Sequence, residues 1–448
     1  MYNLHGFNKT AKIHLQFIVF IIVIILLFSP ALKAGETAEV FSLEKTIQTA
    51  ISKNIELLKA KEKINAATAA KNASRAIFLP TFNATYQFKH NYEEISNRLL
   101  GITTPEDEYV FAASVTQPLF AGFSIINRYK LAGLGLDAAD LNEKITRLEI
   151  IYRASKAYFS VLKALKIEGV LQETVTQLSA HENVAKSFYE VGMTPLNDLL
   201  KSQVELANSR QELTIVINNL EYAKSDFNTL LRRPINSSVD LVDILNYVPL
   251  TNALDYYLEL AQKNRLEIKL ADLQIEMAEK EVELAKKDYY PTVTLTGTRY
   301  QRGTDWNVDG GSGISDPNSW NIYAVASWNF WEWGKTCYGE KEKKSQLQQA
   351  NLNKDDILDK IRLEVKQSFL KTKEAESNII TVQKAIEQAK ENLRISQERY
   401  KEQISTSTDV LDAQTLLSRT MTNYFNALYD FKISKASLSR ALSMEIIE

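Results

Sequence analysis

The stretches "YEVGMTPLNDLLKSQ" (189–203) and "YKEQISTSTDVLDAQ" (400–414) decide the fold. The second begins 211 positions after the first and keeps tyrosine, aspartate, leucine and glutamine in register. Two further pairs have the same spacing: "LPTF" (79–82) with "YPTV" (290–293), and "PLF" (118–120) with "NFW" (329–331). The chain therefore consists of two internal repeats, which we assign to residues 35–240 and 241–448.

The placement of the nine prolines predicts long helices. None lies in 119–194 and none follows Pro317. Because proline breaks helix interiors, the sequence permits two very long helices at 123–190 and 334–401, each of about 68 residues and ~100 Å. Apolar residues within them repeat every 3.5 positions, which is typical of coiled coil. Shorter helices are expected at 42–79, 195–232, 251–290 and 406–444.

Four stretches alternate between apolar and polar residues: 81–90, 109–117, 292–301 and 320–330. Segments of about ten alternating residues fit a transmembrane β-barrel better than a soluble sheet. Trp320 begins the last stretch, and Trp328, Trp331 and Trp333 lie at its other end. These are the positions at which aromatic residues contact the two membrane interfaces. The alternative is a soluble β core that contains the aromatics.

The N-terminus indicates the compartment. Residues 1–34 carry lysines but no acidic residue, then the apolar run "LQFIVFIIVIILLF" (15–28), then small residues up to Ala34. This pattern predicts a secretory signal peptide, whereas a transmembrane anchor needs about 20 apolar residues. The single cysteine, Cys337, permits neither an internal disulfide nor an N-terminal lipid anchor on cysteine. We expect a location beyond the inner membrane of a Gram-negative cell.

Charge and motifs exclude several classes of function. Loss of residues 1–34 lowers the net charge from −2 to −5, and a mildly acidic chain without a basic patch argues against nucleic acid as a partner. No nucleophile elbow, phosphate loop or zinc spacing is present, so we expect no enzyme, no cofactor and no metal site. The stretch "DWNVDGGSGISD" (305–316) has the acidic spacing of a calcium loop, but a polar hairpin loop explains it better.

The order of elements, the "PT" that enters two strands, the "PLF" with the following glycine, and the Y-x-x-G…D-(V/L)-L-x-x-Q motif resemble the TolC-like outer membrane factors. The resemblance covers essentially the whole mature chain. It implies a mixed fold, in which a long α-helical coiled-coil barrel continues a transmembrane β-barrel with four strands per protomer and 12 per homotrimer. A closed barrel is also required on physical grounds, because four strands cannot close alone and open edges are not tolerated in lipid. A trimer of threefold symmetry can form such a closed barrel.

Asp409 and Asp412 are three residues apart, so a helix presents both on one face. Thr406 and Asp409 have the spacing of a helix start, and capping could account for Asp409 but not for Asp412. The resemblance places this turn at the periplasmic entrance of the duct. Threefold symmetry would then form two rings of carboxylates that select cations.

The resemblance also implies that the two turns dock a periplasmic adaptor (membrane fusion protein), which connects to an inner-membrane pump of the RND or ABC type. The residues concerned are Tyr189, Gly192, Thr194, Asp198, Tyr400, Ser405 and Thr408, of which Asp198 also fits a cap or packing role. Two positions depart from the family pattern: Gln403 replaces the glycine found at 192, and Ser405 occupies a position that is often basic. Both concern how the entrance is held closed.

We therefore predict a trimeric, passive exit duct in the outer membrane, with a long periplasmic extension and a periplasmic end gated by rearrangement of helix–turn–helix units. The sequence does not distinguish drug efflux, metal efflux and type I protein secretion. A different class, a soluble periplasmic coiled-coil adaptor or scaffold, would explain the helices but not the alternating strands or the tryptophans.

Overall fold

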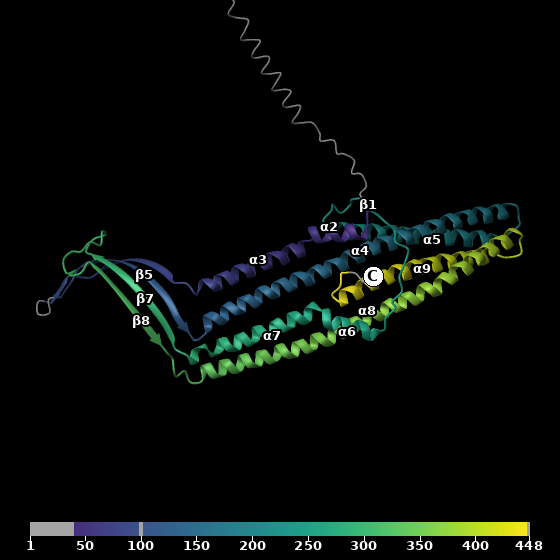
Figure 1. Cartoon of the computed structure of the whole chain (residues 1–448). Helices are drawn as coiled ribbons and strands as arrows, with labels where there is room; N and C mark the ends of the chain where they lie inside the picture. The colour runs from purple at the N-terminus through teal and green to yellow at the C-terminus, as the bar shows by residue number, and fades with distance from the viewer. Residues whose placement is uncertain (1–39, 98–101, 446–448) are drawn as a thin grey trace, which may run out of the picture.

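The computed structural model describes residues 40–97 and 102–445, and the predicted signal peptide at 1–34 lies outside them. The chain is elongated, with a sheet at one end and two helical turns at the other (Figure 1). In chain order the elements are β1 (Val40–Phe41), α2 (Leu43–Lys53), α3 (Ile55–Ala76), β2 (Thr81–His90), β3 (Ile95–Asn97), β4 (Ile102–Thr104), β5 (Asp107–Ala121), α4 (Ser124–Glu190), α5 (Leu196–Leu230), β6 (Asp240–Leu241), α6 (Leu254–Asn264), α7 (Leu266–Ala285), the 3-10 helix η1 (Lys286–Tyr289), β7 (Thr292–Gly303), β8 (Asn318–Ser327), α8 (Lys335–Lys401) and α9 (Ser407–Ala441).

The helices α4 and α8 contain 67 residues each, which at 1.5 Å per residue gives a length of about 100 Å. Both start one residue later than the sequence predicts. The shorter helices lie end to end along them: α3 and α5 follow α4, and α7 and α9 lie between α4 and α8 (Figure 1). The chain is therefore about four helices wide along most of its length.

The same backbone occurs twice. Both ends of α4 and α8 differ by 211 positions, as do both ends of α5 and α9. The strand register follows the same offset, since Thr81 pairs with Thr116 and Thr292 pairs with Ser327. Even left-handed residues recur at this offset: Phe123 with Gly334, Gly192 with Gln403, and Arg232 with Ser443.

Two predicted helices are wrong, because each is broken once. The range 42–79 contains α2 and α3, separated at Asn54, whose extended backbone lets its side chain accept a 2.8 Å hydrogen bond from the Glu56 amide. The range 251–290 contains α6 and α7, separated at Arg265, and ends in η1. Asn54 is a cap that the sequence could have indicated, whereas Arg265 has no side-chain cap.

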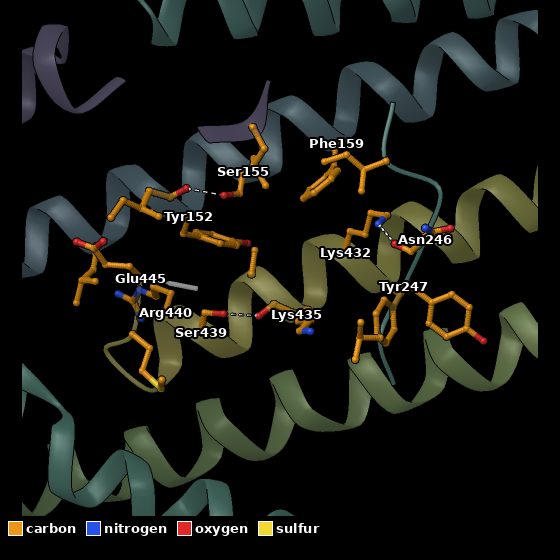
Figure 2. A pocket seen from close by; sticks show the side chains of 18 residues that line it. Tyr152, Ser155, Phe159, Asn246, Tyr247, Lys432, Lys435, Ser439, Arg440 and Glu445 are labelled. Atoms are coloured by element: carbon orange, nitrogen blue, oxygen red, sulfur yellow. Dashed lines mark hydrogen bonds between the residues drawn. The ribbon is translucent and has the colours of Figure 1, made fainter. Parts of the chain in front are cut away.

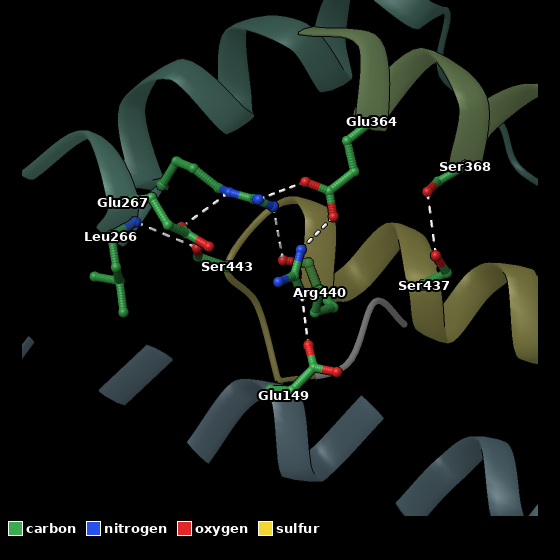
Figure 3. A network of polar contacts seen from close by, with 9 residues as sticks. Glu149, Leu266, Glu267, Glu364, Ser368, Ser437, Arg440 and Ser443 are labelled. Carbon is green, nitrogen blue, oxygen red and sulfur yellow. Dashed lines mark hydrogen bonds and ion pairs between the residues drawn. The ribbon is translucent and has the colours of Figure 1, made fainter. Parts of the chain in front are cut away.

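The backbone of Arg265 is extended. Its side chain is 4% exposed and lies within an ionic network (Figure 3). It forms ion pairs with Glu267 at 2.9 Å and Glu364 at 2.5 Å. Arg440 bonds the same Glu364 and also pairs with Glu149 at 2.9 Å. Buried charges are tolerated only when they are paired, so this network fixes the ends of α7 and α9 between α4 and α8.

The sheet has the order β2-β5-β7-β8 and is antiparallel throughout. The central pair, β5 with β7, joins the two halves of the chain. The edge strands β2 and β8 each have one unpaired side, and nearly all of their residues are exposed. The described chain therefore presents two open sheet edges.

Three of the four predicted strands have different limits in the structure. The range 292–301 extends to Thr292–Gly303. The range 109–117 extends to Asp107–Ala121, with a bulge between Pro118 and Phe120 because proline has no amide to donate. The range 320–330 shifts to Asn318–Ser327, because Ser327 pairs with Thr292, the first residue of β7. The preceding residue, Pro291, cannot continue the ladder. Trp328 and Phe330 thus lie beyond the strand.

Gly122 is required where β5 becomes α4. Its φ is +57°, and an added Cβ would lie 2.2 Å from the Lys287 carbonyl oxygen. We expect Gly122→Ala to lower the free energy of unfolding by at least about 1–2 kcal/mol, because a left-handed residue with a side chain costs that much before the clash is counted. Thermal unfolding followed by circular dichroism measures it.

Gly133→Ala is the matched control. Gly133 lies inside α4, and its nearest foreign atom is the flexible Lys71 Cε at 3.9 Å from an added Cβ. This change should stabilise the helix by up to about 1 kcal/mol. Equal destabilisation by the two variants would contradict the structural role assigned to Gly122.

Candidate functional site at the helical turns

Two turns of one design form the end of the chain that lies opposite the sheet (Figure 1). Residues 191–195 connect α4 to α5, and residues 402–406 connect α8 to α9. In the first turn the Met193 amide donates to the Phe188 carbonyl at 2.8 Å, and in the second the Ile404 amide donates to the Arg399 carbonyl at 2.8 Å. Each helix thus ends in a Schellman-type closure with a left-handed residue.

That left-handed residue is Gly192 in the first turn, with φ of +77°, and Gln403 in the second, with φ of +60°. The replacement of glycine by Gln403 in the second turn therefore changes the side chain but not the backbone conformation. A non-glycine residue pays a steric cost in this conformation, so the second turn carries strain that the first lacks.

The start of α9 is a complete capping box. The Thr406 amide donates to Asp409 Oδ2 at 2.8 Å, and the Asp409 amide donates to Thr406 Oγ1 at 3.4 Å. These bonds from Thr406 hold the pKa of Asp409 below its usual range. The first turn differs, because Pro195 precedes α5 and provides no side-chain cap. The structure thus gives Asp409 the capping role that the sequence had left open.

Asp412 lies one turn further along α9 and is exposed, as is Asp409. Within the described part of the chain, Asp412 forms no hydrogen bond and no ion pair. Its counterpart in the first half is Lys201, whose Nζ donates to Thr408 Oγ1 at 3.0 Å. The two aspartates are thus brought together as predicted, but only Asp409 has a structural task.

An aromatic contact beneath the turns joins the two halves. Tyr400 is 3% exposed, and its ring lies 5.0 Å from His181 and 5.6 Å from Phe188, centroid to centroid. The His181 ring nitrogen lies 2.8 Å from Ser407 Oγ. Burial lowers the pKa of His181, and the negative charge of Asp198 partly opposes this. Sequence reasoning missed His181 and Phe188, although their spacing of seven on α4 is a helical signal.

The other predicted turn residues have two kinds of environment. Tyr189 is exposed, and Gly192 has open space around its α-carbon. The hydroxyl oxygens of Thr194 and Ser405, equivalent positions in the two turns, are buried without a hydrogen-bond partner within the described residues. Buried hydroxyls normally have a partner, but these two oxygens are already enclosed by this chain and offer no accessible atom to a second one.

The predicted aromatic residues lie at the two ends of the sheet. Trp320 is near the start of β8, and Trp328, Trp331 and Trp333 follow its end; all four are exposed. The end of the sheet that holds Trp328, Trp331 and Trp333 also has an aromatic cluster that sequence reasoning missed. In this cluster the centroid of the Phe123 ring lies 5.2 Å from that of Phe120 and 5.3 Å from that of Tyr290. Phe120 is the counterpart of Trp331 at the offset of 211.

Among residues 40–97 and 102–445, no three or more His, Cys, Asp or Glu side chains gather in a way that could hold a metal ion. The loop 305–316 instead folds back on itself, with the Asn307 amide donating to Asp305 Oδ1 at 2.9 Å. No helix in the same ranges is long and apolar enough to cross a membrane.

A bundle about 100 Å long, with an open-edged antiparallel sheet at one end and paired turns at the other, is the architecture of a TolC-like channel subunit. The family model described as outer membrane efflux protein matches residues 46–229 and 257–443, and the chain belongs to that family. Members of this family are transport ducts and not enzymes.

Individual relatives agree with this assignment. The outer membrane protein TolC of Vibrio cholerae is 21% identical over 419 residues, which is 92% of each chain. The solved outer membrane protein VceC of Vibrio cholerae has a TM-score of 0.78 at 18% identity, covering 90% of this chain and 96% of that one. CusC gives a TM-score of 0.77 at 16% identity, covering 93% and 95%. At such identities the structures show a common fold.

The strain at Gln403 can be measured. We expect Gln403→Gly to raise the free energy of unfolding by a few tenths to about 1 kcal/mol, because glycine adopts positive φ without steric cost. The equivalent change in the first turn, Gly192→Gln, should lower it by a similar amount, since nothing but the φ of +77° opposes a side chain there. Circular dichroism melts of both variants provide the comparison, and two shifts of the same sign would contradict the assignment.

Proposed function

We propose that three copies of this chain form a passive exit duct in the outer membrane. The single observation that carries this proposal is the sheet with two open edges, built from two halves that share strand register and helix limits at an offset of 211. Unpaired backbone groups cost several kcal/mol each in lipid, so β2 and β8 require partners. Other copies of the same chain can supply them, and a ring of three gives 12 strands.

The internal offset predicts how the copies meet. Within one chain, β5 of the first half pairs with β7 of the second. At an offset of 211, β8 is the counterpart of β5, and β2 is the counterpart of β7. The equivalent pairing therefore joins β8 of one copy to β2 of the next, and every copy in the ring makes the same contact. Threefold closure is the number implied by the TolC-like resemblance.

The helices support this arrangement. In α9, Leu411 and Leu428 are 7% and 0% exposed, but their counterparts in α5, Leu200 and Ile217, are 49% and 41% exposed. In the same way Phe159 of α4 is 6% exposed, whereas its counterpart Leu370 of α8 is 52% exposed. Contacts of α9 with α4, α5 and α8 bury the first set. A neighbouring copy that packs its α5 on α8 would bury the second, which favours association.

In this assembly the sheet forms the transmembrane barrel and the helices form a periplasmic tunnel. The exposed Trp320 lies at one membrane interface, and Trp328, Trp331 and Trp333 lie at the other, joined by the cluster around Phe123. The two turns then form the periplasmic entrance. Rearrangement of the helix pairs at these turns gates it.

The turns also dock the adaptor, which connects the duct to an inner-membrane pump of the RND or ABC type. The supporting observation is the accessible surface at the first turn, where Tyr189 is exposed and nothing lies within 4 Å of a Cβ added at Gly192. Helical hairpin tips of an adaptor could pack against this surface. Drug efflux and metal efflux both fit this duct.

Two alternatives remain from the sequence. Type I protein secretion uses the same architecture, and no described feature of this chain separates it from efflux of small molecules. A soluble periplasmic adaptor or scaffold is a different class; it would leave β2, β8 and the exposed tryptophans without a partner, so we favour the duct.

Asp409 and Asp412 line the entrance in this proposal, as two rings of three carboxylates. Asp412 carries the argument, because it is exposed and has no structural contact within the described residues. Converging carboxylates in a narrow opening concentrate cations and repel anions. The closed duct should therefore pass small, cation-selective currents that multivalent cations block.

Planar-bilayer recordings can separate the charge of these residues from the helix cap. Asp412→Asn combined with Asp409→Asn removes six carboxylates per trimer, while the amide oxygen at 409 can still accept from Thr406. We expect the ratio of cation to anion permeability to fall severalfold and the block by multivalent cations to weaken. Thermal stability should stay near wild type.

Thr406→Ala is the matched structural control. It should cost about 1 kcal/mol of stability through the lost cap and leave ion preference unchanged. Asp355→Asn, an exposed carboxylate on α8 distant in sequence from the turn, controls for general surface charge. Wild-type selectivity in the double aspartate variant would overturn the pore-lining assignment.

A further inference from the structure

A cavity of about 220 Å³ lies beside residues 148–159 of α4, away from both the sheet and the turns. Figure 2 shows the side chains that line it. Its walls are α4, α9 and the segment 242–250 that follows β6. Most lining side chains are apolar, among them Ile151, Tyr152, Phe159, Ile244 and Tyr247. All of these residues belong to one chain, so a single copy forms the cavity.

The segment 242–250 is fixed over the cavity by a bond to each long element that it crosses. On α4, the Tyr158 hydroxyl donates to the Val242 carbonyl. On α9, Lys432 Nζ donates to the Asn246 carbonyl at 2.5 Å. On α8, Lys373 Nζ donates to the Leu250 carbonyl at 2.9 Å. A segment without regular structure that is tied at three places forms a fixed wall of the cavity.

The charges that line the cavity are unbalanced. Arg440 is neutralised by Glu149 and Glu364, and the one lining carboxylate, Glu445, pairs with Arg147 at 3.1 Å. The Lys435 carbonyl accepts a hydrogen bond from Ser439 Oγ at 3.0 Å, but its ammonium group makes no hydrogen bond or ion pair with any residue that the structure describes. A partly buried ammonium group without a counter-ion is unfavourable.

Lys432 lies one turn before Lys435 on α9 and lines the same cavity. Burial lowers the pKa of both lysines, and the charge of Lys435 adds to the lowering at Lys432 although Asp243 opposes it. The two ammonium groups therefore repel each other across a site whose remaining surface is mostly apolar. A single negative charge placed between them would relieve this repulsion.

We propose that this cavity binds a medium-chain fatty acid, with its carboxylate at Lys435 and Lys432 and its alkyl chain against Tyr152 and Phe159. The size fits a small ligand, because an apolar cavity of ~150 Å³ holds benzene and drug-sized ligands occupy about 300–1,000 Å³. The site lies apart from the proposed duct entrance. It is a peripheral site on the helical part of the chain and does not depend on the proposed transport function.

Isothermal titration with sodium octanoate, on the full-length protein held in amphipol, tests this proposal. We expect one octanoate per chain. Lys435→Gln should weaken binding at least tenfold, as expected for the loss of a charge-assisted hydrogen bond of about 1.5–3 kcal/mol. Lys435→Arg should restore it, and octanamide, which has the same chain without the charge, should bind at least tenfold more weakly than octanoate.

Two further variants control for folding and for general charge. Ala436→Phe fills the cavity while Lys435 remains, and it should abolish octanoate binding. Lys371→Gln, which removes a lysine that lines a different groove on α8, should leave binding unchanged. Each variant should keep the wild-type circular dichroism melt. Equal binding of octanoate and octanamide, or unchanged octanoate binding by Lys435→Gln, would overturn the proposal, because either would indicate simple apolar partition.

Discussion

The unpaired backbone of β2 and β8 is the constraint on which the rest of the structure depends. The hydrogen-bonding groups of an isolated four-stranded sheet cannot be satisfied at its two edges. Nearly all residues of both edge strands are exposed, and the aromatic residues lie at the ends of the sheet and not in a core. Such a sheet is consistent with a component of a closed barrel, and membership in the outer membrane efflux protein family agrees with that interpretation.

The two halves of the chain share one architecture through duplication, but their turns differ in chemistry. Backbone, strand register and left-handed positions repeat at an offset of 211. The turns differ in chemistry: Pro195 corresponds to Thr406, Gly192 to Gln403, and Lys201 to Asp412. Only the second turn therefore has a capping box and a left-handed residue other than glycine. We propose that the second turn is the one that lines and gates the entrance, while the first provides a more rigid support.

Local sequence signals predicted most of the architecture. The absence of proline gave both long helices to within one residue, and strict alternation placed β2 at residues 81–90. The break at Arg265 could not be predicted, because it depends on Glu364 and Arg440, which are distant in sequence. The aspartates could be assigned to one face of α9 from their spacing, whereas the contact of His181 with Tyr400 and the cavity beside Lys435 arise only from packing between the halves.

The central claim is that β8 of one copy pairs with β2 of the next, and a disulfide tests it most directly. Thr116 pairs with Thr296 inside the chain, so the offset of 211 predicts that Ser327 faces Thr85 of the neighbouring copy. Directly opposite residues have Cα atoms about 4.5–5.5 Å apart, within disulfide range. In a Cys337→Ser background, Ser327→Cys with Thr85→Cys should give a covalent trimer under oxidising conditions. Ser327→Cys with Thr81→Cys, displaced by about 14 Å along the strand, should not, and absence of any cross-link in the first pair would contradict the account.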